Sequence, residues 1–204
     1  NIISQRFKVS VFDLKSKNLI FKEARTYNDW LDKDISNDIL MEIYDLMKWG
    51  PTSANCSPAR IIFVKSKVSK DRLLPYVIES NLEKTKSAPV TAIIGHDINF
   101  HDHLPKLFPH NLDAQNWFNH SIDVAVETAF RNGSMQGAYF IIAARALGLD
   151  CGPMSGFDKE GVDNEFFRDT NIKSNFLCNL GYGDKTKLFE RSPRFKFNEI
   201  CEII

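Results

Sequence analysis

Two groups of polar residues in this sequence contain arginines that could hold a phosphate. Arg25, Thr26 and Asn28 form a run near the start of the chain, and Arg191 and Arg194 lie near its end. The arginine guanidinium is planar, and its fork of donors matches the oxygens of a phosphate. Taken singly, a helix cap, a turn or a solvated face explains each group. Spacing alone does not bring the two groups together.

Two further groups could bind the polar parts of a ligand. The first is a loop that contains Thr52, Ser53 and Asn55. The second is the pair Asn81 and Lys84, which lie three residues apart and therefore share one face if the segment is helical. Two arginines and a lysine with hydroxyl neighbours could together hold one phosphate.

Patterns for several other chemistries are weak or absent. His101 and His103 flank one residue in a polar loop, without the helical spacing of a zinc site, so we interpret them as solvated histidines and predict no metal. The sequence contains no G-x-S-x-G nucleophile elbow and no phosphate-binding P-loop motif. Gly181-x-Gly183 lacks the third glycine of a dinucleotide fingerprint, which favours a turn.

Composition limits the class of protein. The 204 residues correspond to one domain, and 26 Lys plus Arg balance 26 Asp plus Glu, which argues against a global basic field for nucleic acid. The most apolar stretch, residues 137–149, is too short for a membrane span and contains Arg145. The four cysteines form no C-x-x-C pair, and no basic and apolar leader opens the sequence. We therefore expect a cytoplasmic protein with no nucleic-acid or membrane partner.

Hydrophobic periodicity predicts the elements that must position the polar groups. A helix is expected over residues 36–49 with Ser36 as its N-cap, and a second helical region from Ser69 to about residue 86, interrupted at Pro75. Strands are expected over 61–64, 90–95 and 176–180, and a short helix from Asp158 to about residue 167. Residues 151–157 are interpreted as a tight turn, and residues 195–204 as a short amphipathic piece.

The longest predicted helix covers residues 122–147 and is rich in small residues. A helix with this composition lies in a core or at a subunit interface. The small residues are Ala129, Gly133, Gly137, Ala138, Ala143 and Ala144. Residues 1–22 are predicted to be a separate extension, as a strand, a hairpin or a loose arm, and residues 23–204 a single domain.

Several motifs in this order resemble the FMN-dependent nitroreductase family. They are A-R-T-x-N at residues 24–28, LMKWGPTSANCSPARI at 46–61, N-x-x-K at 81–84, ETAFRNGSMQGAY at 127–139, RALGLDCGPMSGFD at 145–158 and NLGYGD at 179–184. More narrowly, the chain resembles the malonic semialdehyde reductase subgroup, which is associated with pyrimidine breakdown. The resemblance covers the chain from about residue 22 to its end.

The resemblance implies an α+β fold, with a mixed β-sheet flanked by helices, and an intertwined homodimer with two FMN sites at its interface. Arg25, Thr26, Asn28 and Arg194 match positions that hold the phosphate and ribityl chain, and Arg191 is expected to replace a further basic residue there. Asn81 and Lys84 match residues at the polar edge of the flavin, and Thr52, Ser53 and Asn55 match residues supplied by the partner subunit. The turn over the flavin face corresponds to Pro153, Met154, Ser155 and Gly156.

The same resemblance implies an NAD(P)H oxidoreductase whose chemistry takes place on the flavin, with Lys84 as electrostatic support and no side-chain nucleophile. The substrate implied by the subgroup is malonic semialdehyde (3-oxopropanoate), which would be reduced to 3-hydroxypropanoate. A broad nitroaromatic or quinone reductase is the alternative enzyme. An FMN-binding sensor or storage module is the alternative from another class.

An aromatic segment between the second strand and the long helix could cover such a flavin. Phe108, Trp117 and Phe118 lie in this irregular segment of residues 100–120. Loops of this kind carry specificity on a rigid scaffold, so the three side chains are candidates for substrate contact. An equally weighted interpretation is that they close the core beneath a long connection.

Overall fold

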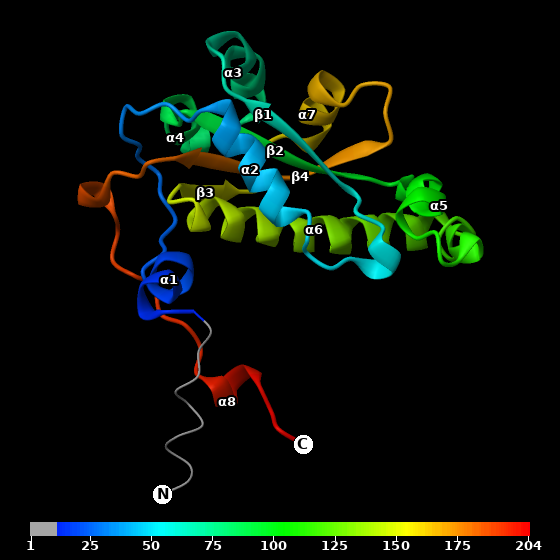
Figure 1. Cartoon of the computed structure of the whole chain (residues 1–204). Helices are drawn as coiled ribbons and strands as arrows, with labels where there is room; N and C mark the ends of the chain where they lie inside the picture. The colour runs from blue at the N-terminus through cyan, green and yellow to red at the C-terminus, as the bar shows by residue number, and fades with distance from the viewer. Residues whose placement is uncertain (1–11) are drawn as a thin grey trace, which may run out of the picture.

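The computed structural model of this protein describes residues 12–204, so the expectation for residues 1–11 lies outside the described part. Four strands form one sheet: β1 (Ala59–Val64), β2 (Val90–Asp97), β3 (Asp150–Met154) and β4 (Ile172–Gly181). Helices cover both faces of this sheet (Figure 1). They are α1 (Leu14–Lys17), α2 (Asn37–Met47), α3 (Lys67–Leu73), α4 (Glu79–Ser87), α5 (Leu104–Leu107), α6 (Ile122–Ala146), α7 (Lys159–Phe166) and α8 (Phe197–Ile200).

The sheet has the strand order β1-β2-β4-β3, and its three strand pairs are all antiparallel. The α+β architecture is as predicted, but the mixed sheet is corrected. Among the described residues, the parallel pairing is a single bridge between Thr26 and Cys151 on β3. The chain leaves β3 after this one pair and next bridges Gly183 through Trp30, so no parallel strand forms.

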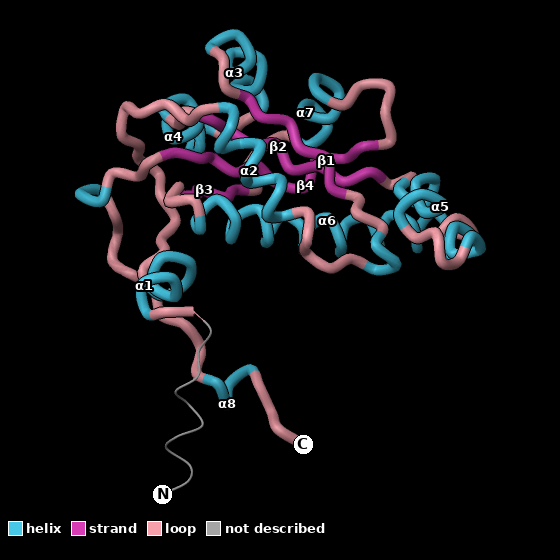
Figure 2. The backbone as a smooth tube through the Cα atoms, viewed as in Figure 1, coloured by secondary structure: helices cyan, strands magenta, loops and turns pink. Residues whose placement is uncertain are grey.

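The core has two layers because β2 alternates its side chains between the faces of the sheet. Ala92 and Ile94 pack with residues of α2 and α6 on one face. Ile93 packs on the other face with residues of α3 and α7. Figure 2 shows the strands between these two helical layers. Every residue of β2 is buried, which makes this strand the centre of the fold.

The small residues of α6 face the chain's own sheet. A Cβ on Gly133 would lie 2.8 Å from His96 Cβ, and one on Gly137 would lie 2.6 Å from the ring of Phe176. This close approach places Gly133 and Gly137 in the core of the subunit, whereas Ala138 is exposed. The opposite face of α6 carries half-exposed apolar side chains: Ile122, Val126, Phe130, Met135 and Tyr139.

Local signals placed most element boundaries correctly. The Ser36 hydroxyl accepts a hydrogen bond from the Ile39 N–H at 3.4 Å, and Asp158 accepts one from Gly161 at 3.1 Å, so both predicted N-caps are confirmed. The second helical region begins earlier than predicted, because Ser66 and not Ser69 caps α3. Residues 150–154 form strand β3, so the predicted tight turn is confined to the residues after Met154.

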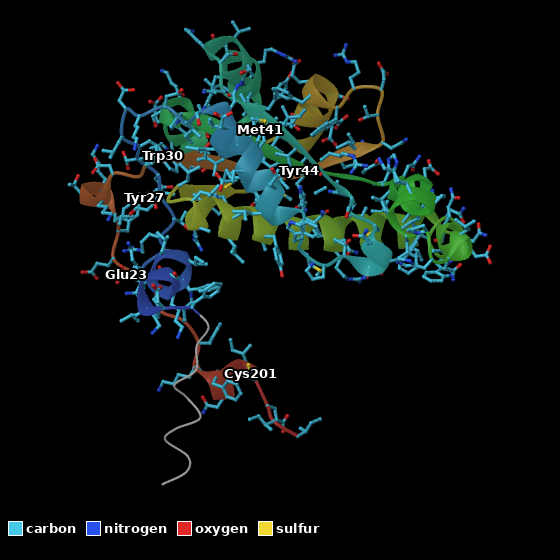
Figure 3. All side chains as sticks on the ribbon, viewed as in Figure 1. Glu23, Tyr27, Trp30, Met41, Tyr44 and Cys201 are labelled. Atoms are coloured by element: carbon cyan, nitrogen blue, oxygen red, sulfur yellow. The ribbon has the colours of Figure 1, made fainter. Side chains whose placement is uncertain are left out.

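Both ends of the described chain lie away from the sheet (Figure 1). Near the start, α1 is followed by a π-helical turn (Asn18–Lys22), so residues 14–22 are helical, and residues 12–22 form neither a strand nor a hairpin. Ile20 is buried, and its carbonyl accepts a hydrogen bond from Arg145 Nη1 at the end of α6 (3.4 Å). At the other end, α8 lies in an exposed tail with Cys201, which Figure 3 labels far from the sheet.

Candidate functional site

Arginines from three distant parts of the chain meet in one cleft of about 240 Å³. Arg25 comes from the segment before α2, Arg145 from the last turn of α6, and Arg191 and Arg194 from the stretch after β4. The cleft is also lined by Ala24, Thr26, Asn28, Phe189, Glu190 and Ser192. The structure therefore brings together the two arginine groups that sequence spacing could not connect.

Backbone carbonyls hold these guanidinium groups in place. Arg25 Nη2 donates to the Phe189 carbonyl, and Arg191 Nη2 donates to the Ala24 carbonyl at 3.1 Å. Arg194 Nη1 donates to its neighbours Ser192 and Pro193 at 3.1 and 3.0 Å. Within residues 12–204, none of the four cleft arginines forms an ion pair with a carboxylate. The cleft thus has a positive charge that an anion would balance.

Arg145 is the cleft residue that sequence reasoning missed. Its Nε is buried and has no hydrogen-bond partner among the described residues. An orphaned buried donor costs about 1–3 kcal/mol, so its presence indicates that something else normally accepts from it. The sequence signal for Arg145 as a site residue was its position, as a charged residue at the end of an otherwise apolar helix.

A carboxylate next to the cleft accepts a hydrogen bond from the backbone. Asp150 Oδ2 accepts from the Gly183 N–H at 2.9 Å. Burial raises the pKa of Asp150, while that hydrogen bond and the charges of Lys185 and Arg145 act in the opposite direction. Burial also raises the pKa of Tyr27, with Asp150 adding to the shift. Asp150 therefore fixes the turn after β4 close to Arg145.

Strand β3 connects the arginine cleft to a second polar group. The Tyr27 N–H donates to the Cys151 carbonyl at 3.1 Å, which places Arg25 and Thr26 beside the start of β3. Figure 3 shows Tyr27 and Trp30 together at this end of the sheet. From Cys151 to Gly156 is five residues, or about 16 Å of extended chain. An elongated ligand with an anionic end could lie along this edge.

The second group is built around the Gly156 carbonyl. It accepts from the Ile78 N–H at 3.2 Å and from Asn81 Nδ2 at 3.0 Å, so the turn after β3 is fixed to the start of α4. A Cβ on Gly156 would lie 2.4 Å from Ile78 Cδ1, which leaves no room for a side chain. Pro153 and Met154 are half-buried here, and Ser155 is exposed.

Lys84 lies one turn further along α4, with a half-buried side chain. Its carbonyl accepts from Trp30 Nε1 at 3.0 Å and from Asn179 Nδ2 at 3.2 Å. Asn81, Lys84 and the turn of residues 153–156 are thus one cluster, as the predicted roles require. Those roles in cofactor binding stay predictions.

The third predicted group lies elsewhere in the subunit. The Ser53 N–H donates to Asn132 Oδ1 at 2.9 Å, and Asn55 Nδ2 donates to the Leu107 carbonyl at 2.8 Å. Asn132 and Arg145 are thirteen residues apart on α6, or about 20 Å along the helix axis. One chain therefore does not bring the Thr52–Asn55 loop to its own arginine cleft.

Backbone strain marks that loop. Ala54, Asn55 and Ser57 have φ values of 48°, 52° and 40°, and they are three of the four non-glycine residues with positive φ in residues 12–204. Such conformations cost of order 1–3 kcal/mol each and cluster at ligand sites and switch regions. The strain is independent support for a functional interpretation of the loop.

The aromatic residues of the segment 100–120 divide between the two interpretations, closing the core and contacting a substrate. Phe118 is 9% exposed and packs at 5.2 Å, between ring centroids, on the fully buried Phe100. Trp117 is 48% exposed and contacts Phe108, with 6.2 Å between ring centroids. Phe118 is thus part of a core cluster beneath α5, and the half-buried Phe108 packs against this cluster, whereas Trp117 is half-exposed.

Within residues 12–204, no three His, Cys, Asp or Glu side chains are grouped so that they could hold a metal ion. Over the same range, no helix has both the length and the apolarity needed to cross a membrane.

The fold and the cleft define an α+β protein with a positively charged cleft beside strand β3. The sequence profile of the nitroreductase family matches residues 22–182, so the chain belongs to the nitroreductase family.

Solved structures share the fold at low sequence identity. YdfN from Bacillus subtilis, described as a nitroreductase, is 19% identical with a TM-score of 0.86, covering 94% of this chain and 100% of that one. A nitroreductase described in complex with FMN, from Exiguobacterium sibiricum, is 16% identical with a TM-score of 0.82, covering 96% and 99%. A protein described as an NAD(P)H:FMN oxidoreductase, from Staphylococcus epidermidis, is 18% identical with a TM-score of 0.80, covering 92% and 95%.

Proposed function

We propose that this protein is an FMN-dependent NAD(P)H oxidoreductase that works as a homodimer in the cytoplasm. The observation that carries the proposal is the arginine cleft, in which four guanidinium groups lack carboxylate partners and Arg145 Nε has no acceptor among the described residues. A buried phosphate supplies the missing acceptors and balances the charge. The residues present therefore fit the cofactor that the family implies.

The chain's own residues would orient the cofactor from both ends of β3. Arg25, Arg145, Arg191 and Arg194 bind the phosphate, and Thr26 and Asn28 offer polar groups to the chain that follows it. Asn81 and Lys84 meet the polar edge of the ring, and the turn of residues 153–156 covers one ring face. When bound, FMN carries electrons from NAD(P)H to the second substrate. A cation at Lys84 stabilises negative charge that develops on the ring's polar edge.

Two features support a homodimer in which each subunit completes the other's site. Thr52, Ser53 and Asn55 lie about 20 Å along α6 from the chain's own cleft, so a second copy must supply them to the same ligand. The exposed tail also carries large apolar side chains that a partner would cover. They are Phe189, Phe195, Phe197, Ile200, Ile203 and Ile204.

For the second substrate we propose a short aldehyde, malonic semialdehyde, on the strength of the subgroup motifs. The half-exposed Trp117 and the half-buried Phe108 are proposed to border the substrate space of the partner's site, since the loop of residues 52–55 lies beside α5. The test is turnover of malonic semialdehyde compared with nitroaromatics and quinones. Faster turnover of nitroaromatics and quinones would instead indicate a broad-specificity reductase.

The cofactor proposal is tested on purified protein stripped of ligand. We expect FMN to bind and to show the yellow absorption of oxidised flavin. Arg25→Ala and Arg194→Ala should each weaken FMN binding more than tenfold, because a charge-assisted contact contributes about 1.5–3 kcal/mol. Arg168→Ala is the matched control, because Arg168 is exposed and donates to its own helix at Asn164. Unchanged FMN retention in both cleft variants would contradict the assignment.

A second measurement separates an enzyme from an FMN-binding sensor. Under nitrogen, NADPH or NADH should bleach the bound flavin within the time of normal turnover. A protein that binds FMN but bleaches slowly or not at all would be a binding module.

The proposed dimer is tested by light scattering at micromolar concentration. A monomer with bound FMN would refute it.

A further inference from the structure

Lys70 is a buried lysine that no part of the proposed chemistry uses. It lies on α3, and only 7% of its surface is exposed. Its ammonium group donates to the Thr85 carbonyl at 2.5 Å, to the Ala88 carbonyl at 2.7 Å and to Thr91 Oγ1 at 3.0 Å. An ammonium has three donors and no acceptor, so Lys70 is fully satisfied by these three oxygens.

Two of these contacts hold the end of α4. The last carbonyls of a helix have no partner within the helix, and a cation is stabilised at this negative end. Lys70 satisfies the Thr85 carbonyl in the last turn of α4 and the Ala88 carbonyl directly after it. The lysine thus closes the C-terminal end of the helix that carries Lys84.

The third contact sets the direction of a chain of hydrogen bonds that returns to Lys84. Because Lys70 can only donate, the Thr91 hydroxyl accepts from it and donates onward to Asn179 Oδ1 at 2.7 Å. This fixes the side-chain amide of Asn179, whose Nδ2 then points to the Lys84 carbonyl at 3.2 Å. Lys70 is therefore connected to the Lys84 backbone in two ways. One is through the end of α4, and the other is through the hydrogen bonds of Thr91 and Asn179.

This arrangement is costly, which argues against a purely structural origin. No carboxylate forms an ion pair with Lys70 among the described residues, and burial lowers its pKa from 10.5 to about 8. Taking an ion out of water usually costs several kcal/mol, which the three hydrogen bonds of Lys70 offset in part, and an apolar side chain of similar volume often packs as well or better. A residue retained against such a cost is a candidate for a functional role.

We propose that Lys70 is a positioning residue for the cofactor site, holding the last turn of α4 so that Lys84 meets the polar edge of the flavin. The inference rests on the proposed function, because it concerns the cofactor proposed there. Lys84 interacts more strongly with the reduced ring, which carries more negative charge, so a misplaced Lys84 weakens binding of reduced FMN more than binding of oxidised FMN.

The experiment measures the affinities of Lys70→Met and Lys70→Gln for oxidised FMN and the midpoint potential of the bound flavin. We expect the preference for reduced over oxidised FMN to fall about tenfold in Lys70→Met, which corresponds to about 30 mV for a two-electron couple. In a Lys84→Met background the same change should alter the preference less than twofold. The control is Lys67→Met on the same helix, where Lys67 is exposed and pairs with Asp71.

Three outcomes would overturn the inference. The first is an unchanged potential in folded Lys70 variants, which would leave Lys70 a stability residue. The second is an equal shift with and without Lys84, which would mean that the Lys70 charge acts directly. The third is loss of fold in both variants. Amide hydrogen exchange of the FMN-free protein adds a cofactor-independent readout, with faster exchange expected at residues 84–88. If wild-type protein binds no FMN, the proposed function fails; if it binds and only the Lys70 effect is missing, this inference alone fails.

Discussion

Replacing Arg145 with methionine should weaken cofactor binding without weakening the fold. Methionine keeps the apolar stem of the side chain, which the end of α6 buries, and removes the guanidinium. In the folded chain that guanidinium has one long hydrogen bond, 3.4 Å to the Ile20 carbonyl, and one buried nitrogen, Nε, without a partner among the described residues. The free protein and its FMN complex should therefore respond in opposite directions.

The two magnitudes follow from the contacts. Removing the orphaned donor gains about 1–3 kcal/mol, and losing the Ile20 contact costs about 0.5–1.5 kcal/mol, so the free protein should gain about 1 kcal/mol. For a chain of this length, that raises the melting temperature by about 2–4 °C. Losing a charge-assisted contact to phosphate costs about 1.5–3 kcal/mol of binding, or about a 10- to 150-fold higher Kd.

The assay pairs thermal unfolding of FMN-free protein with an FMN fluorescence titration, for wild type, Arg145→Met and the exposed control Arg168→Met. The control should leave both quantities unchanged. A lower melting temperature together with an unchanged Kd would refute the reasoning, because Arg145 would then stabilise the fold and not bind the anion.

Three further predictions concern other parts of the structure. Burial lowers the pKa of Lys70 from its ordinary value of 10.5 to about 8 in the folded chain, so the unfolded chain binds more protons between these pH values. The free energy of unfolding of wild type, measured in urea, should therefore rise relative to Lys70→Met by at most about 3 kcal/mol from pH 8 to 10.5, and a flat difference would contradict the burial argument. Phe118→Ala should cost about 3–5 kcal/mol of stability with loss of flavin, whereas Trp117→Ala should keep the melting temperature and FMN content and change the ratio of aldehyde to nitroaromatic turnover. Gly152→Ala would place a Cβ 2.5 Å from the Tyr27 carbonyl, so it should displace the segment beside β3 and raise the Kd for FMN more than tenfold, and a normal Kd would show that the segment can move aside.

Much of the fold could be predicted because its signals are local. Ser36 and Asp158 cap helices where a short polar side chain precedes an apolar repeat, and the apolar runs around Ile62, Ile93 and Leu177 became strands. Strand β3 was missed because its sequence, Asp150 to Met154, contains a glycine and a proline and has no alternating pattern. It is a strand because β4 provides the pairing partner, and pairing is a tertiary interaction.

The residue types of the candidate site were also present in the sequence. Arg25, Arg194, Asn81 and Lys84 could be selected from their chemistry and from motif order, and they lie where a single elongated ligand could contact them. Lys70 could not be selected, because a lysine in a polar helical stretch is normally solvated. Its role depends on α4 and β2 closing over it.

The sequence alone therefore determined the kinds of group available, their order along the chain and the local elements that carry them. The tertiary structure decided which groups meet. Arg25 lies more than a hundred positions before Arg145 and Arg194 in the chain. The three converge because β3 pairs at the edge of β4 and the stretch after β4 returns across residues 24–28. These contacts depend on strand order and on long-range packing, for which residue spacing carries no signal.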